Sequence, residues 1–375
     1  MSNLVLYRKY RPQSFSDFVG QEHIITTITN EIGSDTVSHA YLFCGPRGTG
    51  KTTLARLLAK AVNCQNRKAG AFEPCNKCDS CLDISGGRSI DLIEIDAASN
   101  RGIDEMRELK EGIKFSPVKS KYKFFIIDES HQLTKEAANA LLKTLEEPPA
   151  HAIFVLATTE AHKMIPTIIS RCQRFDFRKL TVPELAGRLE KIAKLENVKI
   201  TPKALELIAV NATGAVRDAL SFLDQITAFG TEGKEISAQE VKSLLGLVEI
   251  ETVSKLIDLI IKKDNSLALG FLNEVADGGM DLSEFSKATI NYLRQILVTK
   301  IMGAENSIVT GLTKEEIKRM SDQAAQFQET DLQRIINLFL DAENKMKYSP
   351  IPQLPLELAV LESIGFQNGI NRASI

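Results

Sequence analysis

Residues 45–52 have the sequence Gly45-Pro46-Arg47-Gly48-Thr49-Gly50-Lys51-Thr52, and this stretch decides the fold around it. It matches the pattern G-x-x-x-x-G-K-[ST], between an apolar run that ends at Cys44 and a helical pattern that begins at Lys51. The glycines let backbone N–H groups surround phosphate oxygens, and the following helix directs its positive end at the anion. We predict a nucleotide-binding loop; the alternative is a glycine turn that only caps a helix.

Two side chains of this loop have specific predicted roles. Lys51 is expected to reach the β- and γ-phosphates of ATP, and Thr52 is expected to bind Mg²⁺. The rest of the loop, together with Thr53, is expected to contact the nucleotide.

A second apolar run, Phe124-Phe125-Ile126-Ile127, ends in two carboxylates, Asp128 and Glu129. After a phosphate loop in the same sheet, this pattern is typical of a Walker B strand. Asp128 would then hold Mg²⁺ and Glu129 would orient and polarise the attacking water. By itself, such a strand is more often a solvated strand end.

Two further positions are candidates for the same chemistry. The run 152–157 ends in Thr158 and Thr159, whose hydroxyls are suited to bond a γ-phosphate or the lytic water; they could equally be ordinary strand-end threonines. Arg171 follows the predicted nucleotide site in the chain. We interpret it as an arginine supplied to a neighbouring subunit's phosphate, against the alternative of a surface ion pair.

Outward from the loop, residues 39–177 alternate short apolar runs with helical patterns, as a parallel α/β sheet with crossover helices does. After Leu180 helical periodicity dominates, with breaks near Gly278, Gly303 and Pro350. We predict a nucleotide-binding domain over 1–180, a small helical domain over 181–242 and an all-helical domain over 243–375. The predicted strands are 39–44, 90–95, 122–128, 152–158 and 171–177, and the helices between them are 51–62, 101–114, 134–147 and 162–169.

Residues 63–88 interrupt this rhythm with four cysteines, Cys64, Cys75, Cys78 and Cys81. Four thiolates at this spacing suit a closed tetrahedral Zn²⁺ site with a structural role, since the insertion is too small to fold by itself. An iron–sulfur cluster or redox thiols are the alternatives. Cys44 and Cys172 fall in apolar runs and are predicted to be buried small side chains.

Composition excludes several classes of protein. The 375 residues are 43% apolar and 25% charged with a net charge of -2, as in an average soluble globular protein and unlike a disordered or fibrous chain. No apolar run is long enough to span a bilayer, so we expect a cytoplasmic location and no membrane partner. The first half is slightly more basic than the second, which permits contact with a polyanion without requiring it.

Taken together, the motifs resemble those of the AAA+ ATPases, and within them the gamma/tau family of the bacterial DNA polymerase III clamp loader. The cysteine insertion is the most discriminating feature, and the match runs motif by motif over about residues 1–230. The motifs, in order, are Tyr7-Arg8-Lys9-Tyr10-Arg11-Pro12, Phe18-Val19-Gly20-Gln21, the phosphate loop, the four cysteines, Asp128-Glu129-Ser130-His131, Ser170-Arg171-Cys172 and Gly214-Ala215-Val216-Arg217-Asp218.

The resemblance implies an ATP-driven motor that opens a sliding clamp and closes it around primer-template DNA. It implies a five-subunit ring with further copies of this chain and delta- and delta-prime-type subunits, a lid domain, a ring-forming collar domain and a location with the replisome at the nucleoid. By the same resemblance, Thr158 is the sensor 1 residue, Arg171 the trans-acting finger and Arg217 the sensor 2 arginine. Val19 and Gly20 lie on the adenine side, with Tyr7 and Arg11 near the same nucleotide. Ser130 and Val216 depart from the commoner family residues, away from the phosphate chemistry.

Three other functions are weighed against this one. Another AAA+ DNA motor, such as a branch-migration helicase, would lack the cysteine insertion, and a non-hydrolysing stator would not need Lys51 and Asp128. A zinc-dependent DNA-binding module is disfavoured by the few basic residues near the cysteines. For DNA contact we name Arg101 as a hypothesis, because residues 96–110 begin a helix after a strand; a solvated helix face explains that segment equally well.

Overall fold

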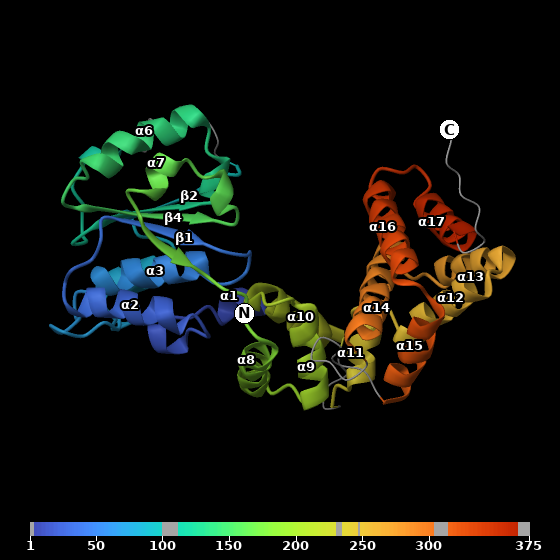
Figure 1. Cartoon of the computed structure of the whole chain (residues 1–375). Helices are drawn as coiled ribbons and strands as arrows, with labels where there is room; N and C mark the ends of the chain where they lie inside the picture. The colour runs from blue at the N-terminus through green and yellow to red at the C-terminus, as the bar shows by residue number, and fades with distance from the viewer. Residues whose placement is uncertain (1–3, 100–111, 230–234, 247, 304–313, 367–375) are drawn as a thin grey trace. The chain divides into compact units, whose positions relative to one another are not determined.

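The computed structural model describes residues 4–99, 112–229, 235–246, 248–303 and 314–366 (Figure 1). Its contacts divide the chain into two compact units, Met1–Val241 and Lys242–Ile375. Each unit has its own apolar core.

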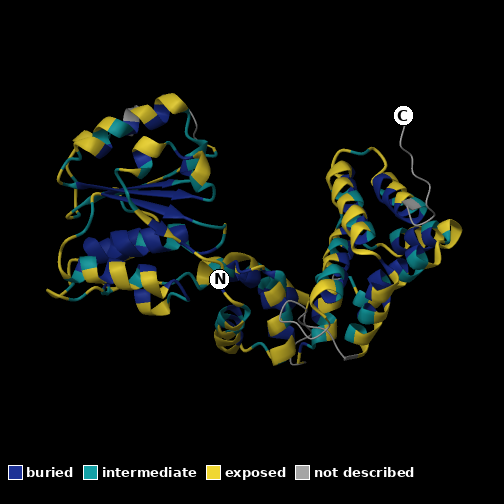
Figure 2. Cartoon of the chain, viewed as in Figure 1, coloured by how far each residue is buried: buried dark blue, intermediate teal, exposed yellow. Residues whose placement is uncertain are grey.

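The first unit contains the predicted parallel sheet, in the order β2-β3-β4-β1-β5. All of its paired strands run parallel, so their carboxyl ends meet at one edge, where Cys44 is opposite Thr158 and Asp96 is opposite Asp128. The central strands are buried on both faces, which agrees with their continuous apolar runs (Figure 2). The strands are β1 Ala40–Cys44, β2 Leu92–Asp96, β3 Lys123–Asp128, β4 Ala152–Thr158 and β5 Gln173–Asp176.

Helices cover both faces of this sheet (Figure 1). On one face, α2 (Glu22–Gly33) and α3 (Lys51–Val62) pack against alternate strand residues such as Phe43 and Val155. On the other face, α6 (Lys135–Glu146) and α7 (Pro166–Ile169) pack against Leu42 and Phe154.

Two of the predicted helices need comment. The helix predicted over 162–169 is confined to α7, after a 3-10 turn at Ala161–Lys163, because a proline disfavours helical backbone in the residue before it. Most of the helix predicted over 101–114, including Arg101, lies outside the described residues.

The amino-terminal segment and the cysteine insertion add short elements to the three layers. The segment forms α1 (Leu6–Lys9) and a 3-10 turn, η1 (Phe15–Asp17). The insertion between α3 and β2 contains α4 (Asp79–Ser85).

Helices follow the sheet, as predicted: α8 (Val182–Leu195), α9 (Pro202–Asn211), α10 (Val216–Phe229) and α11 (Ala238–Leu244). A capping box begins α8, because Thr181 and Glu184 each accept the other's backbone N–H. Apolar residues then recur at helical spacing and bury one face of α8, including Leu185, Leu189 and Ile192.

The regular elements in the described residues of the second unit are all helices, and three of the breaks between them fall near Gly278, Gly303 and Pro350, as predicted; the breaks at residues 263–264 and 327–328 were not predicted. Its helices are α12 (Ile250–Lys262), α13 (Asn265–Asp277), α14 (Leu282–Met302), α15 (Lys314–Gln326), α16 (Glu329–Met346) and α17 (Gln353–Phe366). A core that includes Phe285, Leu293 and Phe339 joins them. Among the helices of the described residues, none combines the length and apolar character that a membrane crossing needs.

Candidate functional site

A cavity of about 560 Å³ opens in the first unit, beside the carboxyl ends of β2 and β3. In parallel α/β sheets this edge is the usual ligand-binding position. Most of the residues predicted to bind nucleotide meet here, although they come from distant parts of the sequence. The lining comprises Tyr7, Arg8, Tyr10, Arg11, Pro12, Phe18, Val19, Arg47, Gly48, Thr49, Gly50, Lys51, Thr52, Thr53, Asp96, Ala98, Asp128, Glu129, Arg188, Val216, Arg217 and Leu220.

The phosphate loop wraps back on itself in a conformation that requires glycine. Gly48 and Gly50 have φ angles of 77° and 103°, which L side chains rarely adopt. The Lys51 ammonium donates hydrogen bonds to the carbonyl oxygens of Gly45 (2.8 Å) and Pro46 (2.9 Å). Gly45 and Pro46 therefore hold the lysine without lining the cavity.

Thr52 and Asp128 lie together at the floor of the cavity, where the Thr52 hydroxyl donates to the Asp128 carboxylate over 2.7 Å. A hydroxyl and a carboxylate are oxygen ligands of the kind that Mg²⁺ prefers. The pair therefore fits the predicted magnesium site, and the cavity leaves room beside it for further ligands.

Glu129 directly follows the strand in an unusual backbone conformation, with φ 47°. A non-glycine residue in the left-handed region is held there by its surroundings and is frequent at functional sites. Its carboxylate accepts a hydrogen bond from the Thr159 hydroxyl over 2.9 Å. Thr159 thus contacts the candidate base directly, whereas its neighbour Thr158 does not line the cavity.

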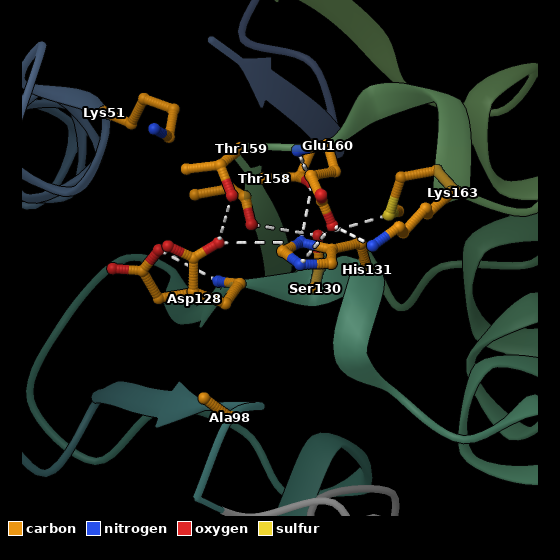
Figure 3. Close-up of polar contacts among 12 residues, drawn as sticks. Lys51, Ala98, Asp128, Ser130, His131, Thr158, Thr159, Glu160 and Lys163 are labelled. Atoms are coloured by element: carbon orange, nitrogen blue, oxygen red, sulfur yellow. Dashed lines mark hydrogen bonds and ion pairs between the residues drawn. The ribbon is translucent and has the colours of Figure 1, made fainter. Parts of the chain in front are cut away.

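Thr158 is buried and belongs to a polar network around His131 (Figure 3). The Thr158 hydroxyl lies 3.0 Å from His131 Nδ1 and accepts a bond from the backbone N–H of Glu160, also over 3.0 Å. His131 Nε2 lies 3.2 Å from the Glu160 carboxylate, which also pairs with Lys163. If Nε2 carries the ring proton, Thr158 donates to Nδ1. The network then holds the hydroxyl of Thr158 in one orientation.

The cavity carries an excess of positive charge, because six basic side chains line it against three carboxylates. Burial lowers the pKa of Lys51, although Glu129 and Asp128 oppose the effect. Burial also lowers the pKa of Arg11 and of Arg188. Desolvated cations of this kind favour an anionic ligand such as a polyphosphate.

Tyr7 and Arg217 meet across one wall of the cavity. The Arg217 guanidinium carbon lies 5.0 Å from the centre of the Tyr7 ring, in a cation–π arrangement. Val19 and Arg11 also line the cavity, but Gly20 does not. Gly20 instead forms a positive-φ turn before Gln21, whose buried side chain exchanges two hydrogen bonds with the backbone of residue 178.

Arg171 lies outside the cavity, in the turn between α7 and β5. It pairs with the Glu146 carboxylate over 2.5 Å and donates to the carbonyl oxygen of Thr167. Its side chain is 32% exposed. The ion pair that the sequence left as an alternative is therefore present.

Several lining residues were not predicted: Arg8, Tyr10, Pro12, Phe18, Asp96, Ala98, Arg188, Val216 and Leu220. One of them had a signal in the sequence. Arg188 occupies the apolar stripe of α8 between Leu185 and Leu189, where a charged side chain needs a partner. It donates to the Tyr10 carbonyl oxygen over 2.8 Å, at the cavity wall.

The four cysteines of the insertion form a second candidate site, since their Sγ atoms all lie within 4.8 Å of one another. An ideal tetrahedral zinc site has S···S distances of ~3.8 Å, and the Sγ atoms of Cys75 and Cys81 are 3.9 Å apart. Backbone N–H groups of residues 77 and 78 donate to Cys75 Sγ. Although desolvation opposes them, these bonds help lower the pKa of Cys75 to about 6. The donor set fits a thiolate-bound metal.

The other two cysteines lie in the sheet core. Cys44 is buried, as predicted, whereas Cys172 is only partly buried against the same core. Burial raises the pKa of Cys172 to about 12, which keeps this thiol protonated and unreactive.

Three family models match the chain in succession. "DNA polymerase III, delta subunit" matches residues 20–181, "DNA polymerase III clamp loader subunit, ATPase lid domain" matches residues 184–232, and "DNA polymerase III subunits gamma and tau domain III" matches residues 236–373.

Curated relatives resemble nearly the whole chain. The tau subunit of DNA polymerase III from Bacillus subtilis is 44% identical over 96% of this chain, and the gamma subunit from Buchnera aphidicola is 36% identical over 97%. The matched region spans 63% of the Bacillus protein and 99% of the Buchnera protein. Among solved structures, a Thermotoga maritima RuvB variant aligns with a TM-score of 0.49 at 21% identity, over 72% of this chain and 86% of RuvB.

Proposed function

Because this chain belongs to the family of DNA polymerase III gamma and tau subunits, we propose that it is an ATP-hydrolysing motor subunit of the bacterial clamp loader. In this role it opens the sliding clamp and loads it onto primer-template DNA. The observation that carries the proposal is the single cavity in which Lys51, Thr52, Asp128, Glu129 and Arg217 converge. A cavity of this size and charge suits ATP.

Lys51 and the backbone of residues 45–50 bind the phosphates in this proposal. The Lys51 ammonium exchanges its contacts with Gly45 and Pro46 for phosphate oxygens, and Arg47 and Thr53 contribute to the same wall. Thr52 and Asp128 hold Mg²⁺, which neutralises charge that develops on the phosphates.

Glu129 acts as the group that orients and polarises the attacking water. Its bond from Thr159 holds the carboxylate at the cavity. Thr158, which lies beside His131, is the residue that responds to the presence or loss of the γ-phosphate. Arg217 reaches that phosphate from α10. Val19 lies on the adenine side of the site, with Tyr7 and Arg11 near the same nucleotide, and Gly20 sets the turn that follows Val19.

Arg171 serves a neighbouring subunit. It lies outside its own chain's cavity, which supports a role in trans, as the finger of an adjacent ATP site in a five-subunit ring. The partners of the ring are further copies of this chain with delta- and delta-prime-type subunits. We place the assembly with the replisome at the nucleoid, in the cytoplasm.

The chain comprises three domains in this proposal: 1–180 with the insertion 63–88, a lid over 181–242 and a collar over 243–375. Cys64, Cys75, Cys78 and Cys81 bind one Zn²⁺, which stabilises the insertion. A closed four-thiolate site offers no open position for catalysis.

The proposal is tested by steady-state ATP hydrolysis of the chain mixed with delta- and delta-prime-type subunits. Lys51→Ala is the inactive variant, and Lys194→Ala, an exposed lysine of α8, is the matched control. Stimulation that needs both clamp and a primed junction is the expected result. Equal stimulation by any duplex without clamp would instead indicate a DNA-remodelling motor, and hydrolysis insensitive to Lys51→Ala would refute the site.

Metal analysis tests the cysteine site separately. About one zinc per chain is expected in the wild type and in Cys172→Ser, with a large loss in Cys81→Ser. Iron with visible absorption in place of zinc would identify a cluster and overturn the assignment.

A further inference from the structure

The cysteine insertion makes a specific contact with the amino-terminal segment of the chain. The Glu73 carboxylate accepts hydrogen bonds from the backbone N–H groups of Phe15 (2.9 Å) and Ser16 (2.8 Å). These groups begin the turn η1 and have no acceptor within the turn itself. Glu73 stands two residues before Cys75, so the backbone that places the metal ligand also places this carboxylate.

Two further contacts join the same parts of the molecule. The rings of Phe72 and Phe15 meet edge to face, with centres 6.4 Å apart. The Gln13 side-chain oxygen accepts a bond from the Ser85 hydroxyl of the insertion, at the end of α4 (3.0 Å), and another from the buried Lys60 ammonium of α3 (2.7 Å), which lies outside the insertion. The segment is thus held by the insertion at residues 13, 15 and 16.

The other end of this segment forms part of the nucleotide cavity. Phe18 follows η1 directly, and its ring lies so close to the phosphate loop that a Cβ on Gly50 would be 2.5 Å from Phe18 Cζ. Phe18 and Val19 line the cavity, and so do residues 10–12 on the other side of the held turn. The position of the turn therefore sets the position of this wall.

The four cysteines form an apolar cluster of their own inside the insertion, where Ile84 of α4 is also buried. The conformation of the insertion depends on whatever joins the four thiolates, as is usual for small metal-folded segments. Without that link, the backbone at Glu73 loses its anchor at Cys75 and keeps only the contacts on its amino-terminal side, such as the bond from Arg67 to the Ala71 carbonyl oxygen.

We propose that Glu73 is a positioning residue that couples the cysteine site to the nucleotide cavity, so that metal in the insertion strengthens nucleotide binding. The inference rests on the proposed nucleotide site. Linkage makes the coupling reciprocal: bound nucleotide also slows loss of the metal.

The test compares Glu73→Gln with Asp79→Asn, an exposed acid of the same insertion. Three quantities are measured: the dissociation constant of a fluorescent ATP analogue, the zinc content, and hydrogen exchange at the amides of Phe15 and Ser16. The glutamine side chain has one oxygen and one NH₂ group. Its oxygen can accept a bond from one of the two backbone N–H groups, but its NH₂ group then faces the other N–H as a second donor. Glu73→Gln should therefore weaken nucleotide binding by about tenfold, with faster exchange at both amides and unchanged zinc, whereas Asp79→Asn should match the wild type.

Removal of zinc with a strong chelator under reducing conditions completes the test. In the wild type, it should weaken nucleotide binding at least as much as Glu73→Gln does, and zinc returned to the protein should restore binding. In Glu73→Gln, it should have a smaller additional effect, because the two changes interrupt one path. Should Glu73→Gln fold poorly by circular dichroism, Gln13→Ala interrupts the parallel contact.

Unchanged nucleotide binding and unchanged exchange at Phe15 and Ser16 in the zinc-free wild type would overturn the coupling. Failure of the proposed function has a different signature: the wild type and Lys51→Ala would bind the analogue equally. In that case hydrogen exchange at the two amides still decides whether metal and Glu73 hold η1.

Discussion

Gly48 is the point at which the phosphate loop touches the first turn of α10, and its replacement by alanine should separate the two. The Gly48 carbonyl oxygen accepts the backbone N–H of Val216 over 3.1 Å. A Cβ built on Gly48 would lie 2.8 Å from the Cβ of Ala215 and 3.6 Å from that of Arg217. Gly48→Ala should therefore displace Arg217 from the cavity and weaken ATP binding.

The size of the effect follows from two costs. Alanine in the left-handed region, at the φ of 77° observed here, costs about 1–2 kcal/mol. Carbon atoms in contact are normally ~3.5–4.0 Å apart, so the loop and α10 must move apart by roughly 1 Å. Overpacking of this kind typically costs about 1–3 kcal/mol. The sum is about 2–5 kcal/mol, and even partial relief should leave binding at least about tenfold weaker.

The assay is titration with a fluorescent ATP analogue, with Gly187→Ala as the matched control. Gly187 is an exposed glycine inside α8 with nothing within 4 Å of its would-be Cβ. Its replacement should leave binding unchanged and stabilise the helix by about 0.5–1 kcal/mol. The double variant Gly48→Ala/Ala215→Gly removes the clashing methyl group, so it should recover the steric part of the loss.

Two results would refute this reasoning. If Gly48→Ala binds the analogue as well as Gly187→Ala does, the contact with α10 has no role in the site. If Ala215→Gly recovers nothing, the loss comes from backbone strain and not from the contact.

Two other perturbations are predicted from buried polar groups. Burial works to raise the pKa of Asp91, but three backbone N–H groups, those of Val118, Lys119 and Ser120, hold it below its usual value. Asp91→Ala should lower the free energy of unfolding by about 3 kcal/mol in urea denaturation. The excess stability of wild type over Asp91→Asn should be complete above pH ~4 and disappear as pH falls below it, because the folded state has the lower pKa; a pH-independent difference would contradict this. His131→Asn should reduce the ATP turnover number about tenfold and leave analogue binding within twofold, because His131 contacts Thr158 and the Glu129 carboxylate but none of the residues proposed to hold the phosphates; equal losses in both would make the role of His131 structural.

The sheet and the phosphate loop were predictable because their signals are local. A central parallel strand is buried on both faces, so it appears in the sequence as an unbroken apolar run, as 152–158 does. The loop depends on glycines whose positive φ angles other residues resist. The strand order and the short helix α7 depend on which elements pack together, which a local pattern does not encode.

The candidate site was predictable where it lies on the sheet edge and less so where the wall comes from other elements. Lys51 and Asp128 both line the cavity because the phosphate loop that precedes Lys51 follows β1, and β1 and β3 end at the same edge of the sheet. Phe18, Tyr10 and Arg188 reach the cavity through contacts between segments far apart in the sequence, and only Arg188 gave a local signal. Gly20 was predicted to bind nucleotide and does not line the cavity. Its neighbours Phe18 and Val19 do, whereas Gly20 forms the positive-φ turn that follows them.

Arg171 and Arg217 differ in how firmly they are held, and the difference fits their proposed roles. Arg217 stands on Tyr7 at the wall of its own cavity, so any shift of α10 moves it relative to the phosphate loop. Arg171 is held by one carboxylate, Glu146, and both side chains are partly exposed. An ion pair of this kind contributes only about 0–1 kcal/mol. Little free energy is therefore lost when Arg171 leaves Glu146 for the phosphate of a neighbouring subunit. An arginine that acts in another subunit's site needs a weakly bound partner of this kind in its own chain.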